Sequence, residues 1–73
     1  MSVFQIGAKN YATCEVEGVM YDVHFHYYGM GSYAIDAVYH LHDHDRRSNL
    51  LKYMDEVWLS FAVDELDRIR EEM

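Results

Sequence analysis

The chain has 73 residues, a formal net charge of −7 and one cysteine, Cys14. A chain of this length forms a single domain, residues 1–73, whose core is too thin to support a deep catalytic cleft. A hydrophobic content of 51% excludes intrinsic disorder, a single cysteine excludes an intramolecular disulfide, and this acidity disfavours direct binding to nucleic-acid phosphates.

The first predicted hairpin covers residues 10–28. The stretch "VMYDVHFHYY" alternates with the period of two that is typical of a half-buried strand, and its core face carries Val19, Tyr21, Val23, Phe25 and Tyr27. A tight turn is expected at Glu17-Gly18, because glycine readily adopts positive φ. Pairing Val16 with Val19 then directs Ala12 and Cys14 to the core. The pattern leaves open whether Val3, Phe4 and Ile6 extend the first strand or form another.

A third strand follows the glycine turn "GMGS". In "YAIDAVYHLH" the alternation predicts a core face of Tyr33, Ile35, Ala37, Tyr39 and Leu41. The same alternation predicts an outer face of Ala34, Asp36, Val38, His40 and His42. These elements form a three-stranded antiparallel meander.

The C-terminal part predicts one amphipathic helix, preceded by a short helical turn in "LLKYM". Asp55 suits the N-cap of a helix from about Glu56 to Glu72. At about 3.6 residues per turn, the core stripe contains Trp58, Leu59, Ala62, Leu66, Ile69 and Met73. We therefore expect an α+β fold, βββα, in which the helix covers one face of the meander.

Two features of this helix suggest contacts with another protein. Its solvent side collects acidic residues, among them Glu56, Asp64, Asp67 and Glu71. Val57 and Phe61 lie outside the core stripe, one turn apart. Either Leu50, Leu51 or Tyr53 folds over these two side chains, or they form a contact patch for another chain. On the outer face of the sheet, Tyr11 and Tyr28 are further candidates, because tyrosine is enriched in interfaces.

Five histidines suggest a metal site as an alternative. They are His24, His26, His40 and His42, on the predicted outer face, and His44 just beyond it. A short hairpin would place Asp22 opposite His40 and Asp36 opposite His26, so that the histidines converge, and imidazole and carboxylate groups suit zinc. Strand alternation alone also directs every second residue outward, so no ligand is needed to explain the pattern. We expect no cofactor and keep zinc binding as the alternative.

The sequence offers no recognisable catalytic set. Cys14 is predicted to point into the core, where a thiol is inert, and "GMG" lacks the strand-to-helix context of a phosphate loop. We therefore expect a protein that is not an enzyme. No uninterrupted apolar run approaches the roughly 20 residues needed to span a bilayer. Together with the missing disulfide, this leads us to expect a cytoplasmic protein that does not bind membranes.

The stretch "VEGVMYDVHFHYYGMGSYAIDAV", followed by the acidic "DEVWLSFAVDELDRIREE", resembles the layout of small acidic accessory proteins encoded by tailed bacteriophages. This resemblance implies a host-cytoplasmic inhibitor of the anti-CRISPR or anti-restriction type. We accordingly expect a non-enzymatic module that binds a protein partner and masks its basic, nucleic-acid-binding surface. The alternatives are a homodimer with a structural or regulatory role, formed through Val57, Phe61 or the outer sheet face, and a histidine-rich module for divalent metals.

Overall fold

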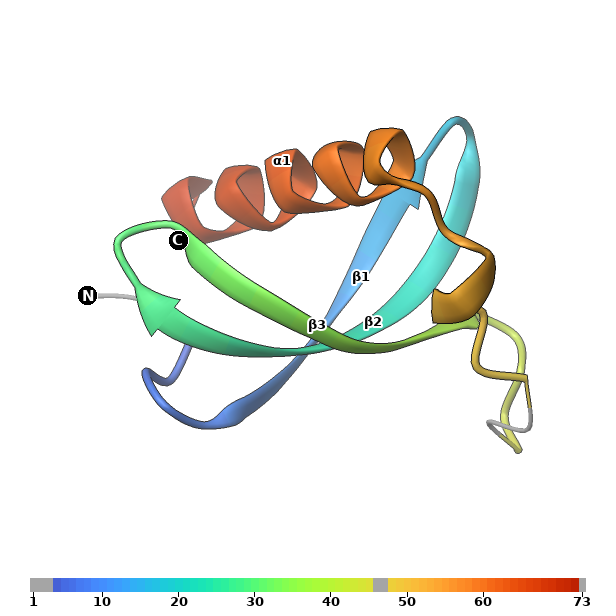
Figure 1. Ribbon diagram of the computed structural model, residues 1–73, viewed down its shortest axis with the longest axis horizontal. Coiled ribbons are helices and arrows are strands. Elements are labelled where there is room, and N and C mark those ends of the chain that lie inside the picture. Colours follow the sequence, from blue (N-terminus) through green and yellow to red (C-terminus); the bar gives the residue numbers. More distant parts are fainter. Residues whose placement is uncertain (1–3, 46–47, 73) are drawn as a thin grey trace.

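The computed structural model describes residues 4–45 and 48–72. Three antiparallel strands, β1 (Lys9–Val16), β2 (Val19–Gly29) and β3 (Ser32–His40), form a sheet in the order β1-β2-β3. A 3₁₀ turn, η1 (Leu51–Tyr53), and the helix α1 (Glu56–Glu72) follow. In Figure 1, α1 lies across one face of the twisted sheet, which confirms the expected βββα architecture. Among the described residues, no helix has the length and hydropathy needed to cross a bilayer.

Both predicted hairpin turns are present. Glu17 and Gly18 have φ angles of 52° and 80°, and Val16 pairs with Val19 as expected. Met30 and Gly31 form the second turn, with φ angles of 54° and 76°. Two consecutive positive φ angles match the right-handed twist of the flanking strands, so the first turn is a two-residue connection that fixes the register of its hairpin. Beside the second turn the register shifts between Tyr27 and Gly29, and Gly29 itself has a φ of 90°.

The core lies between α1 and the helix-facing side of the sheet. Its most deeply buried side chains are Cys14, Val23, Phe25 and Leu66, each with 0% of its surface exposed. Phe4 completes this core from outside the regular strands, with its ring in edge contact with Phe25 at 4.9 Å between centroids. Ile6 forms an isolated parallel bridge with Tyr27 and is exposed, and Val3 lies outside the described residues.

A β-bulge in β3 overturns part of the predicted alternation. His24 pairs with Ala37 but Phe25 pairs with Ile35, so Asp36 is an extra residue in β3. A bulge of one residue shifts the following residues to the opposite face. Beyond it, the predicted faces are therefore reversed. Val38 and His40 face the helix side, opposite Val23 and Tyr21, whereas Ala37 and Tyr39 lie on the outer face, and Leu41 follows the end of the strand.

The helix begins where the sequence predicted. The carboxylate of Asp55 accepts a hydrogen bond from the backbone N–H of Trp58 at 2.8 Å, the geometry of an N-cap. The predicted core stripe is confirmed: Ala62 and Leu66 have 0% exposure, and Trp58 and Ile69 pack against the same core. Met73, the last residue of that stripe, lies outside the described residues.

We expect the Asp55→Ala variant to lose about 1 kcal/mol of unfolding free energy, because the N–H of Trp58 would lose its acceptor at the exposed start of α1. Urea denaturation followed by circular dichroism measures this loss. Ser60→Ala, at an exposed position within the helix, is the matched control and should not destabilise the domain. Equal stability of wild type and Asp55→Ala would show that the cap contributes nothing.

Candidate functional site

The outer face of the sheet holds a buried histidine. The ring of His24 lies between Tyr11 and Tyr39, at centroid distances of 4.6 and 5.2 Å, and Nε2 lies 3.1 Å from the Oδ2 of Asp22. His24 is only 6% exposed although no helix covers this face, because the two tyrosine rings shield it. Its surroundings make it a packed structural residue of the sheet.

His26 forms a second histidine–aspartate pair. Its Nδ1 lies 2.5 Å from the Oδ2 of Asp36, so the two side chains meet, but the expected pairing is wrong: His26 lies opposite Ala34, and Asp36 is the bulge residue. The bulge places the carboxylate of Asp36 beside the ring, and both side chains remain about one-third exposed. One ring nitrogen of His26 is thereby engaged by a neighbour within the sheet.

The predicted convergence of the histidines is wrong. Because of the bulge, His40 pairs with Tyr21 and stacks on its ring at 5.5 Å, on the helix side of the sheet, and Tyr39 takes the expected place of His40 opposite Asp22. His42 and His44 are exposed in the connection after β3. Across residues 4–45 and 48–72, no three histidine, cysteine, aspartate or glutamate side chains are close enough together to hold a metal ion.

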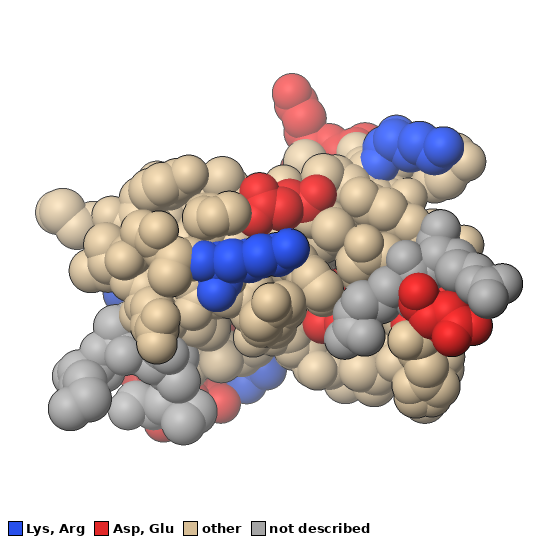
Figure 2. Space-filling model, turned by 90° about the horizontal axis from the view of Figure 1, so that it is seen from below, with Lys and Arg blue, Asp and Glu red and all other residues tan. Residues whose placement is uncertain are grey.

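The remainder of the outer sheet face is exposed and sparsely charged. Tyr11, Met20 and Tyr28 are 63%, 40% and 58% exposed, in agreement with their predicted orientation. Figure 2 views the molecule from the side opposite α1 and shows a largely uncharged surface, on which acidic and basic side chains are scattered. Tyr11 and Tyr28 therefore remain available for contacts, without a charge pattern that would select a partner.

The predicted acidic residues of α1 have two different environments. Glu56, Asp64 and Glu71 are exposed, as a partner-binding role requires. Asp67 is held within the fold: it accepts a hydrogen bond from the hydroxyl of Tyr33 at 2.7 Å and pairs with Arg70 at 3.2 Å.

The contact between Tyr33 and Asp67 ties the end of α1 to the start of β3. Burial, together with the hydrogen bond to Asp67, raises the pKa of Tyr33 to about 12. The tyrosine therefore stays neutral and keeps donating to the carboxylate at physiological pH. Asp67 is thus a structural residue in the isolated chain and less suited to binding a partner than Glu56, Asp64 or Glu71.

Val57 and Phe61 remain uncovered. Their exposed fractions are 60% and 46%, so the alternative in which another segment folds over them does not hold. Leu51 turns instead toward Leu59 and Val63, with which it lines an apolar pocket of about 370 Å³ beside β3. Two exposed apolar side chains one turn apart thus form a patch on α1.

A hollow of about 460 Å³ lies beside Phe61, between α1 and the end of β1. We call it the acidic hollow, and its lining residues are Glu15, Val16, Glu17, Phe61, Asp64, Glu65 and Arg68. Four acidic residues and one arginine line the hollow together with this aromatic ring; Glu15 borders it from the edge of β1, because the strand register directs its side chain to the outer face. A smaller hollow of about 220 Å³, lined by Val57 and Tyr53 among others, shares Glu17 with it.

The charges of the acidic hollow are only partly compensated. Arg68 is bound by Glu65 at 2.8 Å and by Glu72 at 2.9 Å, and the hydrogen bond from Arg68 lowers the pKa of Glu65. Glu15, Glu17 and Asp64 form no ion pair with any residue that the structure describes. The hollow therefore presents net negative charge around an exposed apolar ring.

The sequence analysis found Phe61 and Asp64 but missed Glu15 and Glu17. The signal was present, since Glu17 is the first residue of the turn that the sequence predicted and Glu15 lies two residues before it. Placing them beside Phe61 requires the packing of α1 against β1, which no local pattern specifies.

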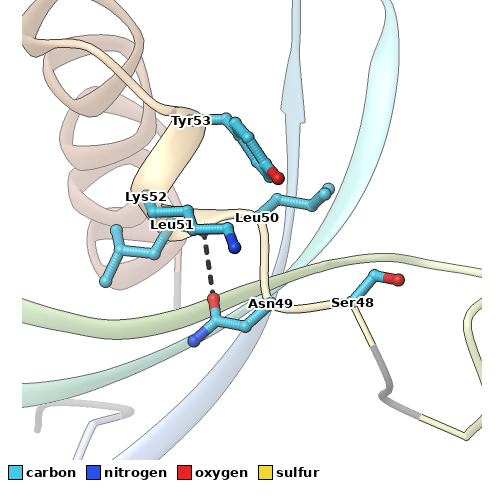
Figure 3. Close-up of a pocket in the computed structure, with 6 residues that line it drawn as sticks. All are labelled: Ser48, Asn49, Leu50, Leu51, Lys52 and Tyr53. Atoms are coloured by element: carbon cyan, nitrogen blue, oxygen red, sulfur yellow. Dashed lines mark hydrogen bonds between the residues drawn. The ribbon is translucent and has the colours of Figure 1, made fainter.

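Two other features carry no site chemistry. A pocket of about 680 Å³ is lined by the consecutive residues 48–53. Figure 3 shows these side chains along a single bend, where the side-chain oxygen of Asn49 accepts a hydrogen bond from the N–H of Leu51 at 3.0 Å. Cys14 is buried as predicted, and burial raises the pKa of its thiol to about 12, so it is a poor nucleophile.

No protein-family model, no curated protein and no solved structure matches this chain.

Proposed function

We propose that this chain is a non-catalytic binding module for a protein with a basic surface, and that the acidic hollow and the neighbouring Val57 form its contact surface. The observation that carries this proposal is the pair of exposed apolar side chains, Val57 and Phe61, surrounded by carboxylates. Interfaces combine an apolar centre, which supplies affinity, with a charged rim, which selects the partner and accelerates association.

The charge distribution supports a basic partner. Residues 55–72 contain seven acidic side chains and two arginines, a net charge of −5 out of −7 for the chain. Glu56, Asp64 and Glu71 are exposed along α1. At about 1.5 Å per residue, Asp64 and Glu71 are separated by about 10 Å along the helix axis. Such spacing suits a surface with several phosphate sites, and we propose that the module masks a nucleic-acid-binding groove as a phage-type inhibitor.

This proposal is tested by affinity capture from a lysate of the natural host, with three immobilised baits. They are the wild type, the double variant Val57→Ser/Phe61→Ser, and Tyr28→Ser as a control on the outer sheet face. We expect a basic protein to be retained by wild type and Tyr28→Ser but lost with the double variant. Duplex DNA in the wash should displace it, because DNA would compete for the same groove.

Two results would contradict the proposal. One is retention of the same proteins by wild type and the helix double variant. The other is loss of binding with Tyr28→Ser alone, which would assign the function to the outer sheet face. Sedimentation equilibrium of the isolated chain tests the homodimer alternative, which the like charges of two acidic hollows disfavour.

A further inference from the structure

The two edge strands of the sheet, β1 and β3, differ in how far they are protected from pairing with another chain. On β3, the bulge at Asp36 interrupts the edge, and the connection after β3 covers Val38. The side-chain oxygen of Asn49 accepts from the N–H of Val38 at 3.1 Å, and the N–H of Leu50 donates to the carbonyl of Val38 at 2.7 Å. Bulges and covering segments are the usual means of preventing an edge from pairing with another chain.

The edge of β1 has no such protection. Its pairing with β2 is regular from Lys9 to Val16, and the strand contains no proline. Within residues 4–45 and 48–72, no segment pairs with its outer side. At about 3.3 Å per residue, these eight residues offer an edge about 26 Å long.

The turn at Glu17-Gly18 determines which backbone groups this edge presents. A two-residue turn is closed by a hydrogen-bonded pair, here Val16 with Val19, and hydrogen-bonded pairs alternate with non-hydrogen-bonded pairs along the hairpin. The N–H and C=O groups of Tyr11, Thr13 and Glu15 therefore point away from β2. Their side chains lie on the outer face of the sheet.

The acidic hollow lies beside the same edge, on the helix side. A strand added antiparallel to β1 would place the residues that bond to Tyr11, Thr13 and Glu15 on the outer face, and the residues between them on the helix side. Those intermediate side chains would approach Phe61 and its carboxylates. A lysine or arginine fits this position, because its aliphatic stem can cover the ring while its charge meets the carboxylates.

We propose that the partner of this module contributes an extended basic segment that adds to the edge of β1 as a fourth strand, with alternate lysine or arginine side chains in the acidic hollow. This inference rests on the proposed function and specifies how the partner binds. A second copy of this chain is a poorer occupant, since a symmetric β1 pair would bring two acidic hollows together.

The test uses the full chain and a nine-residue probe, acetyl-(Val-Lys)₄-Val-amide, with binding measured by isothermal titration calorimetry. In the proposed register the valine amides bond to β1 and the lysine amides point to solvent. We expect N-methylation of three valine amides to weaken binding by about tenfold or more. N-methylation of three lysine amides is the matched control and should change the affinity of the probe by less than about threefold, since those amides have no partner on β1.

Variants of the chain locate the probe. Phe61→Ala should weaken binding by about tenfold, whereas Tyr28→Ala, which removes another exposed ring, on the outer face, should leave it unchanged. Strand addition would be overturned by any of three results. The two methylated probes could bind equally well, the unmethylated probe could fail to bind, or the wild-type chain could form a dimer that the probe does not dissociate. If capture of the host protein still depends on Val57 and Phe61 after such a result, only the proposed binding mode is wrong. If capture does not depend on these two residues either, both proposals fail.

Discussion

Replacing Leu66 with alanine is expected to lower the free energy of unfolding by about 2–5 kcal/mol. Leu66 has 0% exposure and is the side chain of α1 that enters the main core, among Phe4, Cys14, Val23 and Phe25. Truncating it removes buried apolar contacts and leaves a cavity between helix and sheet. Small domains have total stabilities of only about 5–15 kcal/mol, so this single change removes a large part of what holds α1 on the sheet.

Thermal unfolding followed by circular dichroism measures this effect. In a domain of this size, about 1 kcal/mol corresponds to roughly 4–8 °C in Tm, so Leu66→Ala should melt at least about 10 °C below wild type. Phe61→Ala on the same helix is the control and should stay close to wild type, because the ring is already 46% exposed. A small decrease in Tm for Leu66→Ala together with a large decrease for Phe61→Ala would mean that α1 packs on the sheet through its other face.

Alkaline pH is expected to destabilise the domain through Cys14. Burial raises the pKa of this thiol from 9.0 to about 12, so the unfolded chain loses its proton at a lower pH than the folded chain. The neutral thiol is thus the form that the fold tolerates. The contribution of Cys14 to stability is therefore constant below about pH 9 and is lost as the pH rises from about 9 toward 12. At about 1.4 kcal/mol per pH unit, the loss due to Cys14 reaches roughly 2–3 kcal/mol by pH 11.

Urea denaturation at pH 8, 9, 10 and 11 measures this slope, with Cys14→Ala as the comparison. The variant retains every tyrosine, including Tyr33, whose pKa is also raised, so the difference in slope between the two proteins isolates the thiol. We expect the slope of Cys14→Ala to be shallower between pH 9 and 11. Parallel slopes would show that the thiol reaches solvent in the native state.

Local signals in the sequence predicted the elements of the fold. The turn at Glu17-Gly18 set the register of the first hairpin, because a two-residue turn leaves a single way to pair Val16 with Val19. Asp55 marked the start of α1, because its carboxylate reaches the N–H of Trp58 within one helical turn. Each of these signals acts over a few residues and needs no knowledge of the remaining structure.

The bulge at Asp36 could not be predicted from the sequence. Strict alternation continues through it in "YAIDAVYHLH", because Val38 and Tyr39 are both apolar and either can face the core. The structure resolves this ambiguity by burying Val38 and placing Asp36 beside His26. Reversal of the faces beyond the bulge separated His40 from His24, which removed the predicted histidine cluster.

Contacts between distant segments were also beyond local patterns. The hydrogen bond between Tyr33 and Asp67 joins residues 34 positions apart. The sequence therefore placed Asp67 on the acidic face of α1 but could not show that its carboxylate is hydrogen-bonded to Tyr33. The sequence likewise left open what covers Val57 and Phe61. Their exposure depends on η1 lying beside β3, where Leu51 lines a pocket together with Leu59 and Val63.

A ¹H–¹⁵N correlation spectrum of the chain, titrated with acetyl-(Val-Lys)₄-Val-amide, tests the central claim most directly. If a basic strand binds between β1 and α1, the largest shift changes will lie in residues 9–17 and in residues 57–68, and the amides of Tyr11, Thr13 and Glu15 will become protected from hydrogen exchange. Changes confined to β3 and the outer sheet face around Tyr28, or no changes at millimolar peptide, would contradict it.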